Sequence, residues 1–327
     1  GVWLYFHPPP ILSSHVKKDS LNFFVIGAAK AGTTTVFERL NARSDVYLSP
    51  LKEPNYYSSD IDTSKFSPEF RANTSLDMSD YFSQSPLPIL QVGFIRDSSE
   101  YASLFAPAPS TALIRGECST SYLFSHAAPA ALAAEHPNAR ILIMLRNPID
   151  RLYSHYMMAR KYGFTSLPLC EAVEKDLAHP SPAWGASELF VQLGLYSQQI
   201  SRWRAHFPDI QIKIMLTEDL RAPDKWQDLL DWLKLPQAAT QHNKSDANRG
   251  GLARFEKLNR FLTSHGLKHK LGNLIPSSLK NKLVTWYYNS EALPKMTTEE
   301  REYVSGIYAE EIATLQRELK LEVGNWK

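Results

Sequence analysis

The sequence has few cysteines, no long apolar segment and almost no net charge. Its 327 residues include two cysteines, Cys118 and Cys170, which is too few for a disulfide framework or a tetrahedral zinc site. Because a reducing compartment suits such a chain, we expect a cytoplasmic protein without a metal centre. No apolar run approaches the about 20 residues that cross a bilayer, so no membrane span is expected. The formal charge of +2 gives no general attraction to nucleic acid, and none is expected as a partner.

The length and apolar content suit one large domain. With 43% hydrophobic residues, the chain can bury a full core. The first twenty residues contain the run Pro8-Pro9-Pro10 and are interpreted as an extension. We therefore expect an N-terminal extension over residues 1–20 and a single domain over residues 21–327.

The segment 22–40, NFFVIGAAKAGTTTVFERL, predicts a strand, a glycine loop and a helix. Residues 23–26 form an apolar run that is typical of a buried strand, and an apolar helical pattern starts at Val36. The loop ends at Gly32, and three threonines follow it in the first turn of the helix. Backbone N–H groups at such a helix start, together with the helix dipole, attract anions. The segment therefore predicts an anion site.

The loop departs from the nucleoside triphosphate motif at one position. A Walker A loop has lysine directly after its second glycine, whereas here Thr33 follows Gly32 and the lysine is Lys30. A P-loop nucleotide kinase or nucleoside triphosphatase is therefore kept as the alternative function. An ordinary tight turn with a solvated lysine is the other interpretation of the loop taken alone.

A second strand-to-helix junction lies in the segment 139–162. Residues 141–145 are apolar without alternation, which predicts a central parallel strand that is buried on both faces. Arg146 follows at the carboxyl end of that strand, and Ser154 lies about two turns into the next helix. We expect Arg151, in the same helix, to form an ion pair on the helix surface.

The two junctions together resemble the PAPS-dependent sulfotransferases (PAPS is 3′-phosphoadenosine 5′-phosphosulfate). The sequence Lys-x-Gly-Thr-Thr after a strand resembles their 5′-phosphosulfate loop, and Arg-Asn-Pro followed by the serine resembles their 3′-phosphate signature. The resemblance implies PAPS as sulfuryl donor, without a metal. It also implies a late basic, glycine-containing loop over the cofactor, for which Lys244, Arg249 and Arg254 are the candidates, and an ordinary basic surface loop is the alternative interpretation of this segment. The predicted cofactor-binding residues are Lys30, Ala31, Gly32, Thr33, Thr34, Thr35, Arg146, Ser154 and Arg249.

Sulfuryl transfer needs a fixed cation beside the departing bisphosphate and a base for the acceptor proton. We predict Lys30 as the cation and Glu53 as the base. Glu53 lies in Lys52-Glu53-Pro54, which resembles the catalytic-glutamate segment of carbohydrate-type and many bacterial sulfotransferases. Without the neighbouring motifs, Lys52 and Glu53 would be interpreted as a charge pair on a solvated turn.

Three other residues are alternatives to Glu53 as the base. Glu117 lies in Gly-Glu-x-Ser-x-x-Tyr, which resembles the acceptor-side segment of the family. His155 and His126 are further alternatives, because one branch of the family uses a histidine base.

Strands that alternate with helices, with phosphate loops at the strand ends, predict an α/β fold. We expect a P-loop-like three-layer sandwich with a central parallel sheet flanked by helices. Further helices are predicted over residues 187–207, 224–235 and 297–319. A strand over 211–216 leads to Thr217, where family members often have a tyrosine near the adenine. The implied function is sulfuryl transfer to a hydroxyl or amine of a small-molecule or saccharide acceptor.

Overall fold

The computed structural model describes residues 21–74, 77–237, 252–253, 263, 288–289, 294–318, 320–323 and 325–326. The predicted N-terminal extension lies outside these residues, as do Lys244, Arg249 and Arg254 of the late basic loop. The division into an extension and one domain therefore stays a prediction, and so does the role of Arg249.

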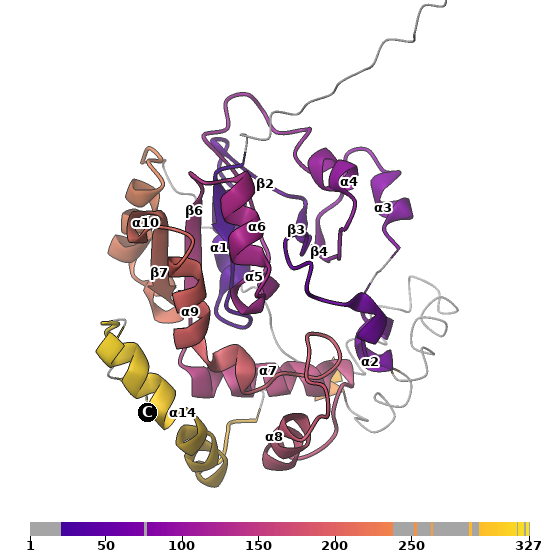
Figure 1. The fold of residues 1–327 in the computed structure, drawn as a ribbon, viewed down its shortest axis with the longest axis vertical. Helices are drawn as coiled ribbons and strands as arrows, with labels where there is room; N and C mark the ends of the chain where they lie inside the picture. Colours follow the sequence, from indigo (N-terminus) through magenta and orange to yellow (C-terminus); the bar gives the residue numbers. More distant parts are fainter. Residues whose placement is uncertain are drawn as a thin grey trace, which may run out of the picture.

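A five-stranded parallel sheet forms the centre of the fold, in the order β2-β5-β1-β6-β7. Every neighbouring pair in this sheet is parallel, so all five carboxyl ends lie at the same edge. This arrangement confirms the predicted α/β fold (Figure 1). The sheet strands are β1 (Phe23–Val25), β2 (Val46–Leu48), β5 (Ile114–Cys118), β6 (Arg140–Leu145) and β7 (Ile212–Leu216).

The two strands that were predicted to be buried are the most deeply buried of the central sheet. The side chains of β1 and those of residues 141–145 in β6 have no exposed area. Burial on both faces is typical of a parallel strand that is covered by helices, and it explains why these runs show no polar alternation.

Two small sheets lie outside the central one. The first joins β3 (Leu51–Glu53) to β4 (Leu90–Val92) in parallel, on the side of the central sheet away from β7 (Figure 1). The second joins β8 (Leu252–Ala253) to β9 (Tyr288–Asn289) in antiparallel orientation.

Helices follow the strands of the central sheet and surround it. In Figure 1, α7 runs across one end of the sheet, and α8 and α14 lie beside α7. The α-helices are α1 (Thr33–Asn41), α2 (Pro68–Ala72), α3 (Ser79–Phe82), α4 (Ser98–Ser103), α5 (Ser121–Phe124), α6 (Ala128–Glu135), α7 (Pro148–Tyr162), α8 (Leu169–Leu177), α9 (Tyr196–Arg204), α10 (Pro223–Trp232) and α14 (Thr298–Glu318). Short 3-10 helices are η2 (Thr63–Lys65), η3 (Gln192–Gly194), η4 (Asp209–Gln211) and η5 (Thr217–Arg221).

The prediction of one long helix over 187–207 is wrong. The segment contains the 3-10 turn η3, a break at Leu195 and then α9. Tyr308 of α14 packs against this turn, where a Cβ at Gly194 would lie 2.5 Å from the Tyr308 hydroxyl oxygen, so glycine suits the position. The chain therefore turns where another helix approaches closely, which periodicity along 187–207 does not reveal.

Helix α14, in the C-terminal part of the chain, packs against α7, α8 and α9. Arg301 at its start forms an ion pair with Asp150 of α7, with the nitrogen and oxygen 2.7 Å apart. The Tyr153 hydroxyl also donates to the Pro294 carbonyl oxygen, 2.7 Å away. These contacts bring residues 294–301 to the face of α7 that carries Ser154.

Within the described part of the chain, no helix has the length and apolar character that a membrane crossing requires. The cytoplasmic location stays a prediction.

Candidate active site

The loop between β1 and α1 has the geometry of an anion cradle. Gly32 occupies the N-cap position of α1 with φ of +90°, and a Cβ there would lie 2.8 Å from Leu220 Cδ1. Among the described residues, no side chain caps this helix start. The first-turn N–H groups of a helix lack intrahelical acceptors, so those of Thr33–Thr35 suit an anionic ligand.

The side chain of Thr217 contacts the same loop. Its hydroxyl oxygen lies 2.9 Å from the Ala31 carbonyl oxygen and 3.0 Å from that of Leu145, at the end of β6. Ala31 has no exposed area, and its part in cofactor binding stays a prediction. Thr217, singled out as a departure from the family pattern, therefore joins the two predicted phosphate motifs.

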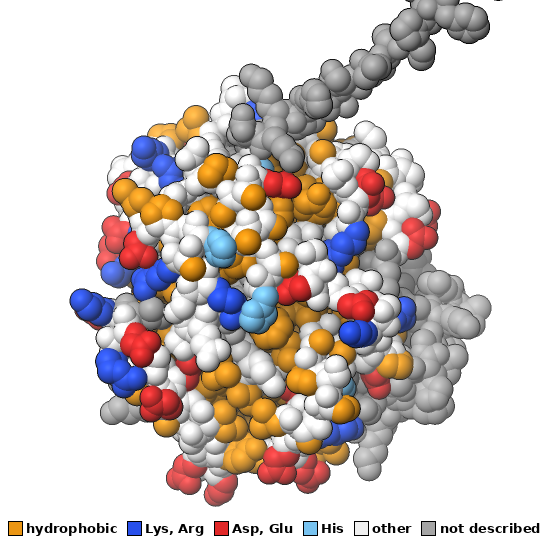
Figure 2. Space-filling view, in the orientation of Figure 1, with side chains coloured by type: hydrophobic (Ala, Val, Ile, Leu, Met, Phe, Trp, Pro, Cys, Tyr) orange, Lys and Arg blue, Asp and Glu red, His pale blue; other side chains and the backbone are white. Residues whose placement is uncertain are grey.

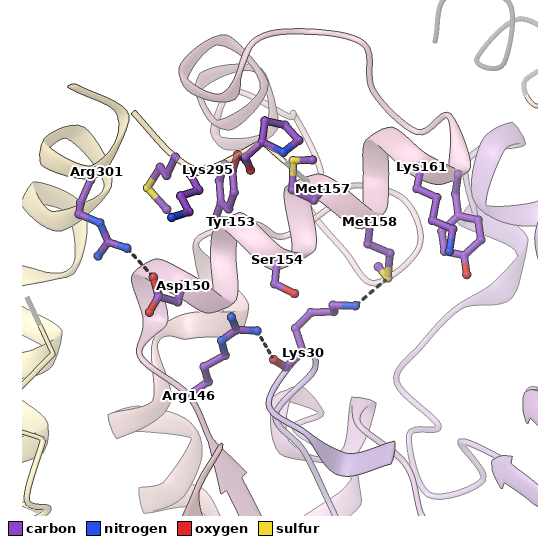
Figure 3. A pocket seen from close by; sticks show the side chains of 13 residues that line it. Lys30, Arg146, Asp150, Tyr153, Ser154, Met157, Met158, Lys161, Lys295 and Arg301 are labelled. Carbon is purple, nitrogen blue, oxygen red and sulfur yellow. Dashed lines mark hydrogen bonds and ion pairs between the residues drawn. The ribbon is translucent and has the colours of Figure 1, made fainter. Parts of the chain in front are cut away.

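Lys30, Arg146 and Ser154 line one cavity of about 550 Å³, although the first is more than a hundred residues from the others. Figure 3 shows their side chains pointing into the same space. Arg146 Nη1 donates to the Lys30 carbonyl oxygen at 3.3 Å, and Lys30 Nζ lies 3.6 Å from Met158 Sδ. The structure therefore brings together three of the residues that were predicted to bind the cofactor, from both phosphate motifs.

The cavity has an excess of positive charge. Asp150 is the one carboxylate among its described lining residues, and it is paired with Arg301. On the face shown in Figure 2, acidic and basic side chains are interspersed. A cavity with an excess of positive charge favours a ligand with several negative charges. The cationic lining residues are Lys30, Arg146, Lys161, Lys295 and Arg301.

The pKa of Lys30 is lowered to about 8, chiefly by burial and in addition by the charges of Arg146, Lys161 and Arg151. The nearby charge of Glu53 acts in the opposite direction. An anion in the cavity would favour the ammonium form, because it offsets the crowded positive charges.

Four cavity residues on α7 follow from helical spacing. Asp150, Ser154, Met157 and Lys161 recur at intervals of four, three and four residues, so they share one face. Counting from Ser154 would have identified Asp150 and Lys161 in the sequence. No sequence signal identifies Lys295, because it reaches the cavity only through the packing of distant segments.

Glu53 is held at the end of β3 by three donors. Its Oε1 accepts from Lys52 Nζ at 2.9 Å, and its Oε2 accepts from the backbone N (3.2 Å) and hydroxyl (2.7 Å) of Thr120. Lys52 is 2% exposed, so the interpretation of a solvated charge pair is wrong. The Glu53 side chain keeps 13% of its area exposed. Glu53 is outside the residues that line the cavity, but its charge acts on Lys30.

The turn after Glu53 is fixed by Asn55. This buried residue has φ of +51°, in the left-handed region that asparagine tolerates better than most residues. Its side-chain nitrogen donates to the carbonyl oxygens of Glu53 (2.9 Å) and Gly93 (2.8 Å). Its side-chain oxygen accepts from the Ser121 hydroxyl at 2.6 Å. The side chain of Asn55 therefore links the backbone of Glu53 to Gly93, directly after β4, and to Ser121 of α5.

Glu117, the second base candidate, is completely buried in β5. Its carboxylate accepts from the hydroxyls of Tyr101 (2.6 Å), Tyr122 (2.8 Å) and Ser119 (2.8 Å). Burial raises the pKa of Glu117 to about 7, although these hydrogen bonds oppose the shift. A carboxylate enclosed in this way cannot contact an acceptor, which favours Glu53 as the base.

Neither histidine alternative is well placed. His155 is buried, and burial together with the charges of Arg151 and Lys30 lowers its pKa well below the usual range. Its ring lies between the Arg151 guanidinium (3.4 Å) and the Glu188 carboxylate (3.4 Å). His126 is exposed, and its backbone N donates to Asp60. Neither histidine is among the residues that line the cavity.

Comparison with known proteins identifies the family. A family model described as "Sulfotransferase domain" matches residues 21–246, which is more than half of the chain. The chain belongs to the PAPS-dependent sulfotransferase family, a family of enzymes, as its two phosphate motifs predicted. This result favours the sulfotransferase over the kinase alternative.

Curated relatives include two kinds of sulfotransferase. Human (Homo sapiens) carbohydrate sulfotransferase 15 is 22% identical over 230 residues, covering 61% of this chain and 40% of the relative. Mouse (Mus musculus) bifunctional heparan sulfate N-deacetylase/N-sulfotransferase 3 is 30% identical over 149 residues, covering 42% of this chain and 17% of the relative. The chain therefore spans less than half the length of these relatives.

The solved structures support the fold. A sulfotransferase from Alicyclobacillus acidocaldarius superposes with a TM-score of 0.60 at 23% identity, covering 94% of this chain and 98% of that one. The similarity extends over almost the whole chain, and it supports the α/β three-layer architecture.

Proposed function

We propose that the chain transfers the sulfuryl group of PAPS to a hydroxyl or amine of a saccharide or small-molecule acceptor. The observation that carries this proposal is the cavity in which Lys30, Arg146 and Ser154 meet beside the uncapped start of α1. The donor supplies an activated sulfate and leaves as the 3′,5′-bisphosphate PAP. The excess of cations in the cavity fits so highly charged a ligand.

Each motif has a separate part in binding. The amides and hydroxyls of Thr33, Thr34 and Thr35 would hold the 5′-phosphosulfate end, because they surround the positive end of α1. The Arg146 guanidinium and Ser154 hydroxyl would hold the 3′-phosphate. The Arg146 contact with the Lys30 carbonyl keeps the two motifs in a fixed relation.

Lys30 and Glu53 would carry the chemistry. The Lys30 ammonium stabilises the negative charge that grows on the leaving bisphosphate, and burial strengthens this effect. Glu53 accepts the proton of the acceptor hydroxyl or amine. Lys52 and Thr120 orient its carboxylate, which still has exposed surface for an acceptor.

A saccharide is the acceptor class that the relatives support. The names of the two curated relatives specify a carbohydrate and heparan sulfate. Identity of 22–30% over part of their length supports the class of acceptor and not a particular sugar.

Transfer of radioactive sulfate from ³⁵S-labelled PAPS tests the function. The acceptors are a uronic-acid polysaccharide, a neutral oligosaccharide, a glucosamine-containing polysaccharide and a simple phenol. We expect the wild type to label at least one saccharide, and Lys30→Ala to lose about 10²- to 10³-fold in rate. Labelling of the phenol alone would contradict the saccharide assignment. A wild type that neither binds PAP nor labels any acceptor would overturn the proposed function.

A further inference from the structure

Arg151 is in α7 and lies between Arg146 and Ser154 in sequence, but it does not line the cavity. Its side chain is completely buried, so the expectation of an ion pair on the helix surface is wrong. Burying a guanidinium costs free energy unless an opposite charge and hydrogen bonds compensate for the lost water. The contacts of Arg151 show whether such compensation is present.

The hydrogen-bond partners of Arg151 are neutral. Its Nη2 donates to the Phe190 carbonyl oxygen, which also accepts from the Tyr308 hydroxyl at 3.2 Å. Its Nη1 lies 3.4 Å from His155 Nδ1. A guanidinium cannot accept a hydrogen bond, so Nδ1 is the acceptor and the imidazole proton is on Nε2, toward Glu188. Within the described part of the chain, Arg151 Nε has no hydrogen-bond partner.

The neighbouring carboxylates have other contacts. Asp176 accepts from the backbone N–H groups of residues 188–190, and Glu188 faces His155. Glu311 accepts from the backbone and hydroxyl of Ser197. No ion pair joins Arg151 to a carboxylate of the described residues. Its charge is therefore not neutralised by direct contact.

The charge of Arg151 reaches the cavity. Arg151 and Ser154 are three residues apart on α7, so they are neighbours on the helix. In agreement with this placement, the charge of Arg151 is one of those that lower the pKa of Lys30, and it also acts on Tyr196, whose hydroxyl donates to the Arg146 carbonyl at 2.9 Å. The medium between these groups is the protein interior, where charges are screened much less than in water. Arg151 thus adds to the positive potential at Lys30 although it is not one of the cavity-lining residues.

We propose that Arg151 is a buried electrostatic element of the anion site, which strengthens the binding of multiply charged ligands without touching them. This inference rests on the proposed function for the identity of the natural ligand. The contribution grows with the charge of the ligand, because a remote cation acts through the potential and not through a contact geometry. If Arg151 acted only through the fold, Arg151→Lys would disturb binding as much as Arg151→Gln, although it keeps the charge.

Calorimetric titration with PAP and with adenosine 5′-phosphate tests this inference. Arg151→Gln keeps an N–H donor for the Phe190 carbonyl and removes the charge, and Arg151→Lys keeps the charge. We expect Arg151→Gln to weaken PAP binding about tenfold and adenosine 5′-phosphate binding about threefold. We expect Arg151→Lys to stay within about twofold of the wild type for both ligands.

Tyr308→Phe is the matched control, because it removes a donor to the same carbonyl without changing the charge. It should bind both nucleotides like the wild type. Equal losses for the two nucleotides in Arg151→Gln, or an unchanged affinity for PAP, would overturn the inference while the proposed function stands. If Arg151→Gln does not fold, a tenfold loss of PAP affinity in folded Arg151→Lys would also overturn it. A wild type that binds neither nucleotide would overturn both.

Discussion

The cavity along α7 and the hydrogen-bonded network around β5 lie at the same edge of the sheet, but their charged groups differ in sign and in exposure. In the cavity, several cationic side chains and the carboxylate of Asp150 line a space that is left for a ligand. Around β5, the carboxylate of Glu117 is enclosed by three hydroxyl donors, and no space is left for one. Glu53 lies between these extremes, since it is held by three donors and still partly exposed. Exposure therefore separates a carboxylate that can react from one that supports the fold.

The largest expected effect concerns Glu53. Glu53→Gln keeps the size of the side chain and removes the base, so turnover should fall about 10²- to 10⁴-fold. PAP affinity should change little, because Arg146 and Ser154 are untouched. Steady-state transfer rates with calorimetric PAP titration measure the two effects. Turnover within a few-fold of the wild type would mean that the base lies elsewhere.

Lys30→Ala should reduce turnover by about 10²- to 10³-fold, because one preorganised donor at a developing negative charge is lost. Lys161→Ala is the matched control, since it removes a cation from the same cavity but outside the glycine loop. Transfer rates for both variants compare the two lysines. Equal losses would show that the general potential of the cavity matters more than the position of Lys30.

Glu117 should affect stability in a pH-dependent manner. Its pKa rises from 4.5 in the unfolded chain to about 7 in the fold, so between these values the folded state binds more protons. The wild type should therefore lose roughly 3 kcal/mol from this group as the pH rises through that window. Urea unfolding at pH 5 and pH 8 measures this change. Glu117→Gln should remove this part of the pH dependence, and an identical dependence in both proteins would contradict the buried-carboxylate account.

The smallest expected effect is a difference between the wild type and Lys30→Arg in the pH dependence of PAP affinity. The pKa of Lys30 is lowered to about 8, so its ammonium is lost above that pH and PAP affinity should fall by up to about tenfold per pH unit. In Lys30→Arg the guanidinium stays protonated, so the affinity should stay nearly constant from pH 7 to 9.5. Titrations across this range test the difference. A wild-type profile as flat as that of Lys30→Arg would show that the cation is not titrating.

Local pattern predicted the two strand-to-helix junctions, because buried strands and phosphate loops are encoded within some twenty residues. It therefore predicted that Lys30, Arg146 and Ser154 belong to one site. It did not predict the burial of Lys52 and Arg151, since polarity alone suggests exposure and their partners come from distant segments. The far wall of the cavity, with Lys295 and Arg301, depends on how α14 packs on α7. Such contacts between distant segments leave no periodic signal in a single sequence.

The most direct test of the central claim is the thermal unfolding midpoint with PAP, compared with ATP in the presence and absence of magnesium. A ligand that binds only the folded state raises the midpoint by mass action. We predict a rise with PAP that does not need magnesium and is lost in Arg146→Ala but kept in Glu53→Gln. A magnesium-dependent rise with ATP and none with PAP would contradict the account and support the nucleotide kinase instead.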